Sequence, residues 1–159
     1  MENRLSKIFI IGIGNDYRRD DAAGRIVARN LKTRTPPGTE ILEETGEGTA
    51  LLEAWRGAGD VFLIDAVQSG APPGTLHRID VWTQPLPASF FRHSTHAFGI
   101  AEAVELARVL HQLPPRLIIY GIEGERFDAG VGLSPAVEKA VAEVEARLRK
   151  EIGTRSSHA

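Results

Sequence analysis

The sequence predicts an α/β fold: a three-layer sandwich with a mostly parallel, twisted sheet of about five strands and helices on both faces. Short runs that are apolar throughout, typical of strands buried on both faces, alternate with segments whose apolar residues recur at helical spacing. Clusters of proline and glycine separate many of these segments. Because 159 residues suit one core, we expect a single domain over residues 1–152 and a disordered tail over residues 153–159.

The predicted strands are the apolar runs of residues 7–12, 60–65 and 117–122, with two further strands over residues 39–44 and 75–81. Helical spacing predicts helices over residues 22–32, 49–55 and 96–113. A last helix is expected to start at Ser134-Pro135, where the serine caps and the proline occupies the first turn, and to end near Ile152. Residues 82–95 contain two prolines and no clean period, which predicts a long loop.

Composition excludes several classes of function. A formal charge of -2, with acidic residues interspersed among the arginines, argues against a nucleic-acid binder. The absence of cysteine excludes disulfides, thiolate metal ligands and a cysteine nucleophile. No apolar run approaches the roughly 20 residues of a membrane span, and the first one is too short for a signal peptide. We therefore expect a cytoplasmic enzyme or binding domain whose partners are neither nucleic acid nor membrane.

A glycine-rich segment with two acids follows the first predicted strand. Gly12-Ile13-Gly14-Asn15 is a weak nucleotide signal, because the third glycine of a dinucleotide fingerprint and the Walker lysine are both missing. Asp20 and Asp21 stand at a helix start, where the helix dipole favours carboxylates. Both cannot cap the helix, so we expect Asp20 to be the cap and Asp21 to be free for chemistry.

Two more segments carry candidate chemistry near strand or helix ends. Asp65 closes a buried strand, where a carboxylate needs either a hydrogen bond from a neighbouring loop or a positive partner. His93 and His96 lie between the long loop and the next predicted helix, and each alone is more often an ordinary polar residue than a ligand. Two carboxylates and one imidazole suit a divalent metal. A serine hydrolase is disfavoured, because no G-x-S-x-G elbow is present and Ser94 has no evident activating partner.

Three blocks in order along the chain resemble the hydrogenase maturation endopeptidase family: Gly12-Ile13-Gly14-Asn15 with Asp20-Asp21-Ala22-Ala23-Gly24, then Leu63-Ile64-Asp65-Ala66-Val67, then Ser94-Thr95-His96. The similarity extends from about Lys7 to Leu148. It implies that Asp21, Asp65 and His96 are the catalytic and nickel-binding residues, and that His93 lies beside the site or in the loop. Two departures stand out. Asp21 replaces a common glutamate, and Gly46-Glu47 precedes Gly48-Thr49 where the family usually has an aspartate.

The resemblance implies an endopeptidase that removes the C-terminal extension of a [NiFe]-hydrogenase large subunit after nickel insertion. Its partner would be the nickel-loaded precursor. Oxygen ligands and one nitrogen hold a metal modestly, so we expect the nickel to be supplied with the substrate, whose cysteines complete the shell. Two other functions stay open from the residues: a metal- or precursor-binding maturation chaperone that cuts nothing, and a nucleotide-binding α/β domain.

Overall fold

The computed structural model describes residues 3–156 and contains a five-stranded sheet in the order β2-β1-β3-β5-β4. The strands are β1 (Ile8–Ile13), β2 (Thr39–Glu44), β3 (Asp60–Val67), β4 (Leu76–Asp80) and β5 (Arg116–Glu123). Four strands run parallel, and β4 pairs with β5 in the antiparallel direction at one edge. The predicted mostly parallel sheet is confirmed.

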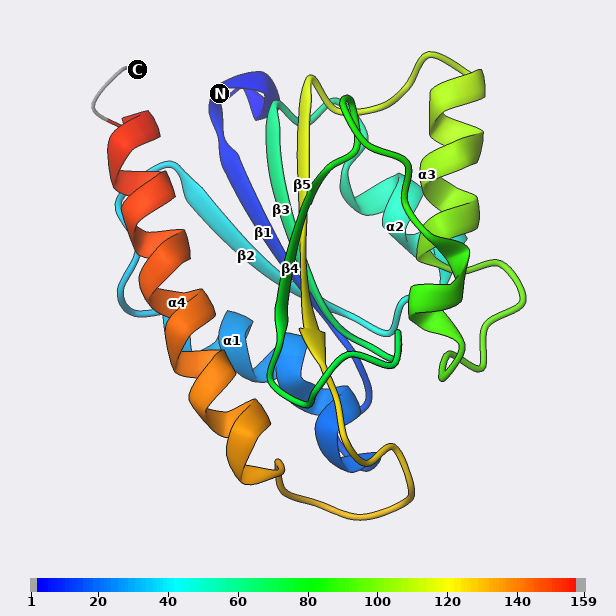
Figure 1. Ribbon diagram of the computed structural model, residues 1–159. Coiled ribbons are helices and arrows are strands. Elements are labelled where there is room, and N and C mark those ends of the chain that lie inside the picture. The colour runs from blue at the N-terminus through cyan, green and yellow to red at the C-terminus, as the bar shows by residue number, and fades with distance from the viewer. Residues whose placement is uncertain (1–2, 157–159) are drawn as a thin grey trace.

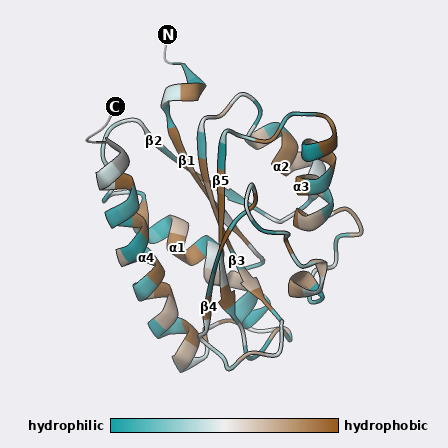
Figure 2. Ribbon diagram, turned by 45° about the horizontal axis from the view of Figure 1, so that its top comes forward, coloured by the Kyte–Doolittle hydropathy of each residue, from teal (hydrophilic) through white to brown (hydrophobic). Residues whose placement is uncertain are grey.

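Helices cover both faces of the sheet (Figure 1). They are α1 (Ala23–Leu31), α2 (Gly48–Ala54), α3 (Ile100–Val109) and α4 (Pro135–Ser156), with short 3₁₀ helices η1 (Arg4–Ser6), η2 (Arg19–Ala22) and η3 (Ala88–Phe91). One apolar core lies between the sheet and the helices α1 and α4, and a second lies between the sheet and the helices α2 and α3. Figure 2 shows the apolar residues concentrated along the strands, as expected for a sheet buried on both faces.

Most predicted boundaries differ from the structure by one or two residues, including β3, which continues two residues past Asp65, and three segments differ by more. The helix predicted over residues 96–113 is shorter: α3 begins at Ile100, because Gly99 is extended and its backbone N–H is satisfied by Glu102 Oε1 at 2.9 Å. The predicted loop over residues 82–95 includes the 3₁₀ helix η3. Helix α4 starts at Pro135 as predicted but runs through Ser156. Residues 153–156 of the predicted tail are therefore helical, and residues 157–159 lie outside the described residues.

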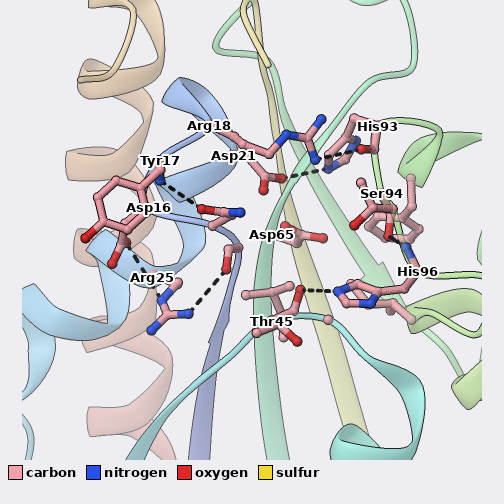
Figure 3. A pocket seen from close by; sticks show the side chains of 17 residues that line it. Asp16, Tyr17, Arg18, Asp21, Arg25, Thr45, Asp65, His93, Ser94 and His96 are labelled. Atoms are coloured by element: carbon pink, nitrogen blue, oxygen red, sulfur yellow. Dashed lines mark hydrogen bonds and ion pairs between the residues drawn. The ribbon is translucent and has the colours of Figure 1, made fainter. Parts of the chain in front are cut away.

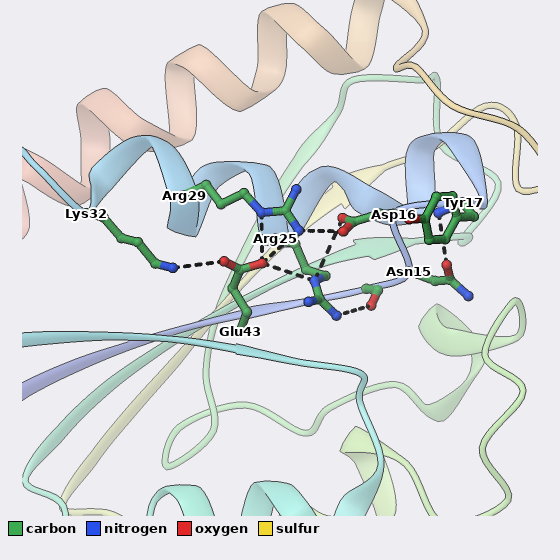
Figure 4. Close-up of polar contacts among 8 residues, drawn as sticks. Asn15, Asp16, Tyr17, Arg25, Arg29, Lys32 and Glu43 are labelled. Atoms are coloured by element: carbon green, nitrogen blue, oxygen red, sulfur yellow. Dashed lines mark hydrogen bonds and ion pairs between the residues drawn. The ribbon is translucent and has the colours of Figure 1, made fainter.

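A network of charged side chains fastens α1 to the edge strand β2 (Figure 4). Glu43 of β2 accepts hydrogen bonds from Arg25 at 3.2 Å, Arg29 at 2.9 Å and Lys32 at 3.1 Å. Burial alone would raise the pKa of Glu43, but these three cations together lower it. Arg25 also donates to the carbonyl of Gly14, so the network reaches the loop that follows β1.

The order of the strands creates a crevice between β1 and β3. The chain passes from β1 through α1 to β2 on one side, then crosses back through α2 to β3 on the other side of β1. In open α/β sheets, ligands bind at such a reversal, outside the carboxyl ends of the strands. Among residues 3–156, no helix is long and apolar enough to span a membrane.

Candidate functional site

A cavity of about 380 Å³ opens at this reversal point (Figure 3). Four stretches line it: residues 13–18 with Asp21 and Arg25 after β1, Asp65 in β3, Thr45 and Gly46 after β2, and the segment from Phe91 to His96 with Ile100. The three segments singled out by the sequence therefore converge, although they are separated by up to about 80 residues in the chain.

Asp65 lies in the middle of the cavity wall and is only 4% exposed. Its Oδ1 accepts a hydrogen bond from the backbone N–H of Ala66 at 2.8 Å. Burial, and secondarily the nearby Asp21 carboxylate, raise the pKa of Asp65 well above its usual range. A desolvated carboxylate beside a second one is costly, and a bound cation would offset that cost.

Asp21 reaches the cavity because glycines let η2 approach β1 closely. A Cβ on Gly14, whose φ is +149°, would stand 1.9 Å from the carbonyl oxygen of Asp21. A Cβ on Gly24 would stand 2.1 Å from the carbonyl oxygen of Ile64. The Gly-x-Gly motif therefore allows close packing, and this packing places Asp21 at the carboxyl end of the sheet. The side of Gly14 on which a Cβ would stand is filled by the backbone of Asp21, and the Gly14 N–H already donates to the Glu44 carbonyl at 3.1 Å, so it is not free for a phosphate.

Asp20 has a different role from its neighbour. It is fully buried and accepts four hydrogen bonds from the loop between β5 and α4. The donors are the backbone N–H groups of Glu125, Arg126 and Ser134 at 2.8, 2.9 and 2.7 Å and the Ser134 hydroxyl at 2.8 Å. Burial opposes ionisation, but these donors outweigh it and lower the pKa of Asp20. Asp20 therefore anchors a distant loop instead of capping its own helix. The Ser134 hydroxyl, predicted to cap α4, donates its hydrogen bond to Asp20.

His93 is the imidazole that lies nearest the two carboxylates. Its Nε2 is 3.2 Å from Asp21 Oδ1, and its side chain is 2% exposed. One ligand atom from each of Asp21, Asp65 and His93 lies within 4.8 Å of the others, a spacing that can hold a metal ion. The His93 ring stacks on Phe127 with centroids 4.4 Å apart.

His96 faces the same cavity from the opposite side of Asp65 (Figure 3). Its Nε2 donates to the backbone carbonyl of Thr45 at 3.2 Å, and it lies four residues before the start of α3. The structure thus brings Asp21 and Asp65 together as the sequence predicts, and it places His93 closer to them than His96. Direct contact of His93 with Asp21 was not expected from the sequence.

Arg18 and Phe127 are site residues that the sequence does not reveal. Arg18 donates from Nη1 to the carbonyl of His93 at 3.1 Å and from Nε to the carbonyl of Phe127 at 3.2 Å. It thereby holds together the loop after β1, the segment before α3 and the loop after β5. Neither residue stands in a recognisable motif, so no sequence signal points to them.

Known proteins share both the sequence pattern and the fold. The Hydrogenase 2 maturation protease of Escherichia coli K12 is 29% identical over 139 residues, which cover 85% of this chain and 84% of that protein. The hydrogenase expression/formation protein HupD of Thiocapsa roseopersicina is 28% identical, and the matched part of this chain spans 62% of its length.

Solved structures agree with the fold. An endopeptidase from Escherichia coli superposes with a TM-score of 0.75 at 28% identity, covering 91% of this chain and 93% of that one. The maturating endopeptidase HybD from Escherichia coli gives a TM-score of 0.69 at 24% identity, a likeness that supports the fold alone.

The decisive comparison is with a family model described as hydrogenase maturation protease, which matches residues 26–151. That match includes Asp65, His93 and His96 and begins after Asp21. It confirms the resemblance stated from the motifs and the predicted class of enzyme, a protease. This chain belongs to the hydrogenase maturation protease family.

Proposed function

We propose that this chain is an endopeptidase that removes the C-terminal extension of a [NiFe]-hydrogenase large-subunit precursor once nickel has been inserted. The observation that carries the proposal is the pair of carboxylates, Asp21 and Asp65, in one cavity with two imidazoles at the reversal point of the sheet. Family membership supports the reaction class, and the names of relatives supply the hydrogenase context.

Asp21 and Asp65 are the proposed anionic ligands of the nickel. Both are buried, and Asp65 has a raised pKa, so both carboxylates gain from a cation between them. The same residues serve as catalytic groups in this proposal, because they lie where the scissile bond must approach.

His96 is the proposed imidazole ligand on the side of the cavity away from Asp21. In its present contact, the Nε2–H group donates a hydrogen bond to the Thr45 carbonyl, and in the neutral ring Nδ1 then carries the lone pair. Coordination through Nε2 would require the Thr45 contact to break. Because residues 94–99 precede α3 and are outside it, a modest movement of this segment can present the ring to a metal.

Nickel is proposed to enter as part of the substrate. The chain has no cysteine, so its donors are limited to oxygen and nitrogen. Thiolates of the precursor would complete the coordination, and occupation of this site would then report that the precursor is loaded. The proposed location of the reaction is the cytoplasm.

Hydrolysis requires a water that attacks the peptide carbonyl and loses a proton, while the C–N bond breaks and the leaving nitrogen gains a proton. Two activations fit the site: nickel can polarise the carbonyl, or one of the carboxylates can accept the proton of the water. In both, the carboxylate pair must face the scissile bond. Arg18 holds the loop after β1, the segment before α3 and the loop after β5 together by its hydrogen bonds to the backbone carbonyls of His93 and Phe127.

The proposal is tested by incubating purified protein with nickel-loaded and nickel-free precursor and measuring the mass of the large subunit. We expect shortening of the loaded precursor only, and its loss in the Asp21→Ala, Asp65→Ala and His96→Ala variants. Full activity of any one variant removes that residue from the proposed site. Binding of the precursor without shortening would identify a chaperone instead.

A nucleotide-binding function is tested by thermal unfolding with and without ATP or NAD. A ligand that binds only the folded state raises the apparent stability. The occupied face of Gly14 supports the expectation of no shift in Tm. A shift of several degrees would favour the nucleotide-binding alternative.

A further inference from the structure

His93 is buried at the metal site proposed above, yet the ligand set of Asp21, Asp65 and His96 leaves it without a role. Its Nε2 contacts Asp21 Oδ1, whereas its Nδ1 is buried with no hydrogen-bond partner among residues 3–156. Buried polar atoms are nearly always hydrogen-bonded. Because Nδ1 has no such bond, no partner of Nδ1 fixes which ring nitrogen carries the proton.

The ring is held rigidly in this position. It stacks on Phe127 at an interplanar angle of 26°, and the backbone carbonyl of His93 accepts a hydrogen bond from Arg18. Both partners come from elements other than the segment that carries His93. A side chain fixed in this way loses little conformational freedom when it binds a ligand.

The donor atoms already stand close to a coordinating arrangement. Ligand atoms of Asp21, Asp65 and His93 lie within 4.8 Å of one another. Donors that each lie roughly 2.1 Å from one ion are about 3.4 Å apart in a tetrahedral arrangement, so a closure of at most about 1.4 Å is required. Nε2 of His93 and Oδ1 of Asp21 are already 3.2 Å apart.

We propose that His93 is a further protein ligand of the metal, so that the chain presents two carboxylates and two imidazoles. The inference rests on the metal site of the proposed function, and Nε2 of His93 is the assigned donor atom. Coordination requires the lone pair of Nε2, so the ring proton moves to Nδ1. Because Nδ1 has no partner among the described residues, this change of tautomer breaks no hydrogen bond of Nδ1.

The competing role for His93 is to orient the Asp21 carboxylate through the contact of its Nε2 with Asp21 Oδ1 at 3.2 Å. Two variants separate the roles. His93→Gln keeps an N–H donor for Asp21 but removes the imidazole ligand, and His93→Phe keeps the aromatic stack on Phe127 but removes both functions. His111→Asn is the matched control, because His111 is exposed outside the cavity and asparagine tolerates its positive φ of 56°.

The test is titration of the precursor-free protein with Ni²⁺ alone, followed by calorimetry. We expect both His93→Gln and His93→Phe to weaken binding by at least about tenfold, and His111→Asn to bind like wild type. In the Co²⁺-loaded protein, NMR should show two paramagnetically shifted imidazole N–H signals in wild type and one in His93→Gln. Circular dichroism of each variant confirms that it is folded.

Wild-type affinity and an unchanged number of imidazole signals in His93→Gln would overturn the inference and leave His93 as a positioning residue. That result leaves the proposed function intact if wild type still shortens the loaded precursor. Conversely, a protein that binds Ni²⁺ through His93 but cleaves nothing would refute the proposed function alone.

Discussion

Two adjacent aspartates in η2, just before α1, have separate roles. Asp20 is fully enclosed by four donors of the loop between β5 and α4, whereas Asp21 faces the cavity and contacts His93. The side chains point to different parts of the molecule because η2 turns as a 3₁₀ helix between them. Asp20 thus anchors the loop between β5 and α4, and Asp21 is the residue proposed as a metal ligand.

The anchoring role predicts that Asp20→Asn is destabilising. An amide offers one acceptor oxygen and places N–H groups against N–H donors, so at least one buried donor is left without a partner. We expect the free energy of unfolding to fall by about 2–3 kcal/mol in urea denaturation. Asp128→Asn is the control from the same loop; its ion pairs with Arg19 and Arg126 are exposed and screened by solvent, so their loss should lower the free energy of unfolding far less. Equal effects of the two substitutions would refute the anchoring role.

The burial of the Asp65 carboxylate predicts that replacing it with asparagine stabilises the fold, the opposite of the effect expected at Asp20. Burial and the neighbouring Asp21 carboxylate both disfavour its charge, so a neutral residue of the same shape relieves a cost of the metal-free protein. Asp65→Asn should raise the free energy of unfolding of the metal-free protein at neutral pH, measured by urea denaturation, and abolish Ni²⁺ binding. A destabilised Asp65→Asn protein would show that the carboxylate is retained for structure.

The sequence identifies Asp65 from its place at the end of an apolar run, because a charge in such a place needs a reason. It cannot reveal what Asp20 does, since its donors lie more than a hundred residues away in the chain. The histidines show the same limit. Both belong to one short segment, and only the packing of Phe127 and Arg18 determines which ring lies beside Asp21.

At the level of elements, the glycines set how closely α1 and η2 lie against the sheet. Gly12 and Gly24 face each other, and a Cβ on Gly12 would meet the carbonyl oxygen of Gly24 at 2.3 Å. With no side chain between them, the helix backbone rests directly on β1 and β3. The distance from β1 to Asp21 therefore depends on these residues.

This packing predicts that Gly14→Ala is severely destabilising. The new Cβ would overlap the backbone of Asp21, and φ at this position is +149°. We expect a loss of about 3 kcal/mol or more in thermal or urea unfolding. Gly153→Ala is the control: nothing lies within 4 Å of its added Cβ, and alanine in a helix should raise stability by ~0.5 kcal/mol. A mild effect at Gly14 would mean that η2 can move away from β1.

A polar cluster fastens α4 to the sheet. Glu151 of α4 accepts hydrogen bonds from Tyr120 of β5 and from Arg78 of β4, the latter at 2.6 Å, and lies 3.6 Å from Arg116. Burial, together with the hydrogen bond to Glu151, raises the pKa of Tyr120 to about 12. Burial alone would raise the pKa of Glu151, but Arg78 and Tyr120 outweigh it and lower that pKa.

The cluster predicts a loss of stability in alkali. Tyr120 keeps its proton in the folded state up to about pH 12, whereas the unfolded chain loses it near pH 10. Its contribution is therefore complete below pH 10 and declines as the pH rises from 10 toward 12. Urea denaturation should show the difference between wild type and Tyr120→Phe shrinking over that range. A difference independent of pH would contradict the hydrogen bond to Glu151.

The elements themselves follow from local patterns to different extents. Apolar runs predict the strands well, because burial on both faces leaves a clear signal. The start of α3 is not readable, since residues 96–99 continue the composition of the helix while their backbone groups bond elsewhere. The end of α4 is also missed: Gly153 suggests a stop, but the helix continues to Ser156.

At the scale of the whole molecule, topology makes the site. The order β2-β1-β3-β5-β4 sends the connections from β1 and β3 apart, and the cavity lies where they separate. Asp21 follows β1 and Asp65 lies in the neighbouring strand β3, so the reversal, together with the close glycine packing of η2 and α1, brings the carboxylates together. A mostly parallel sheet is predictable from the sequence. The antiparallel β4 at the edge depends on a tight return after Gly74 and has no comparable pattern.

The most direct test of the central claim is cleavage of purified large-subunit precursor, followed by mass spectrometry, with and without nickel in the precursor. We expect wild type to release the C-terminal extension only from the nickel-loaded form. Asp21→Asn and Asp65→Asn should be folded and should lower the rate by at least about a hundredfold, since each removes a proposed anionic ligand. Cleavage of nickel-free precursor at the wild-type rate, or full activity of both folded variants, would contradict the claim that these carboxylates read the metal.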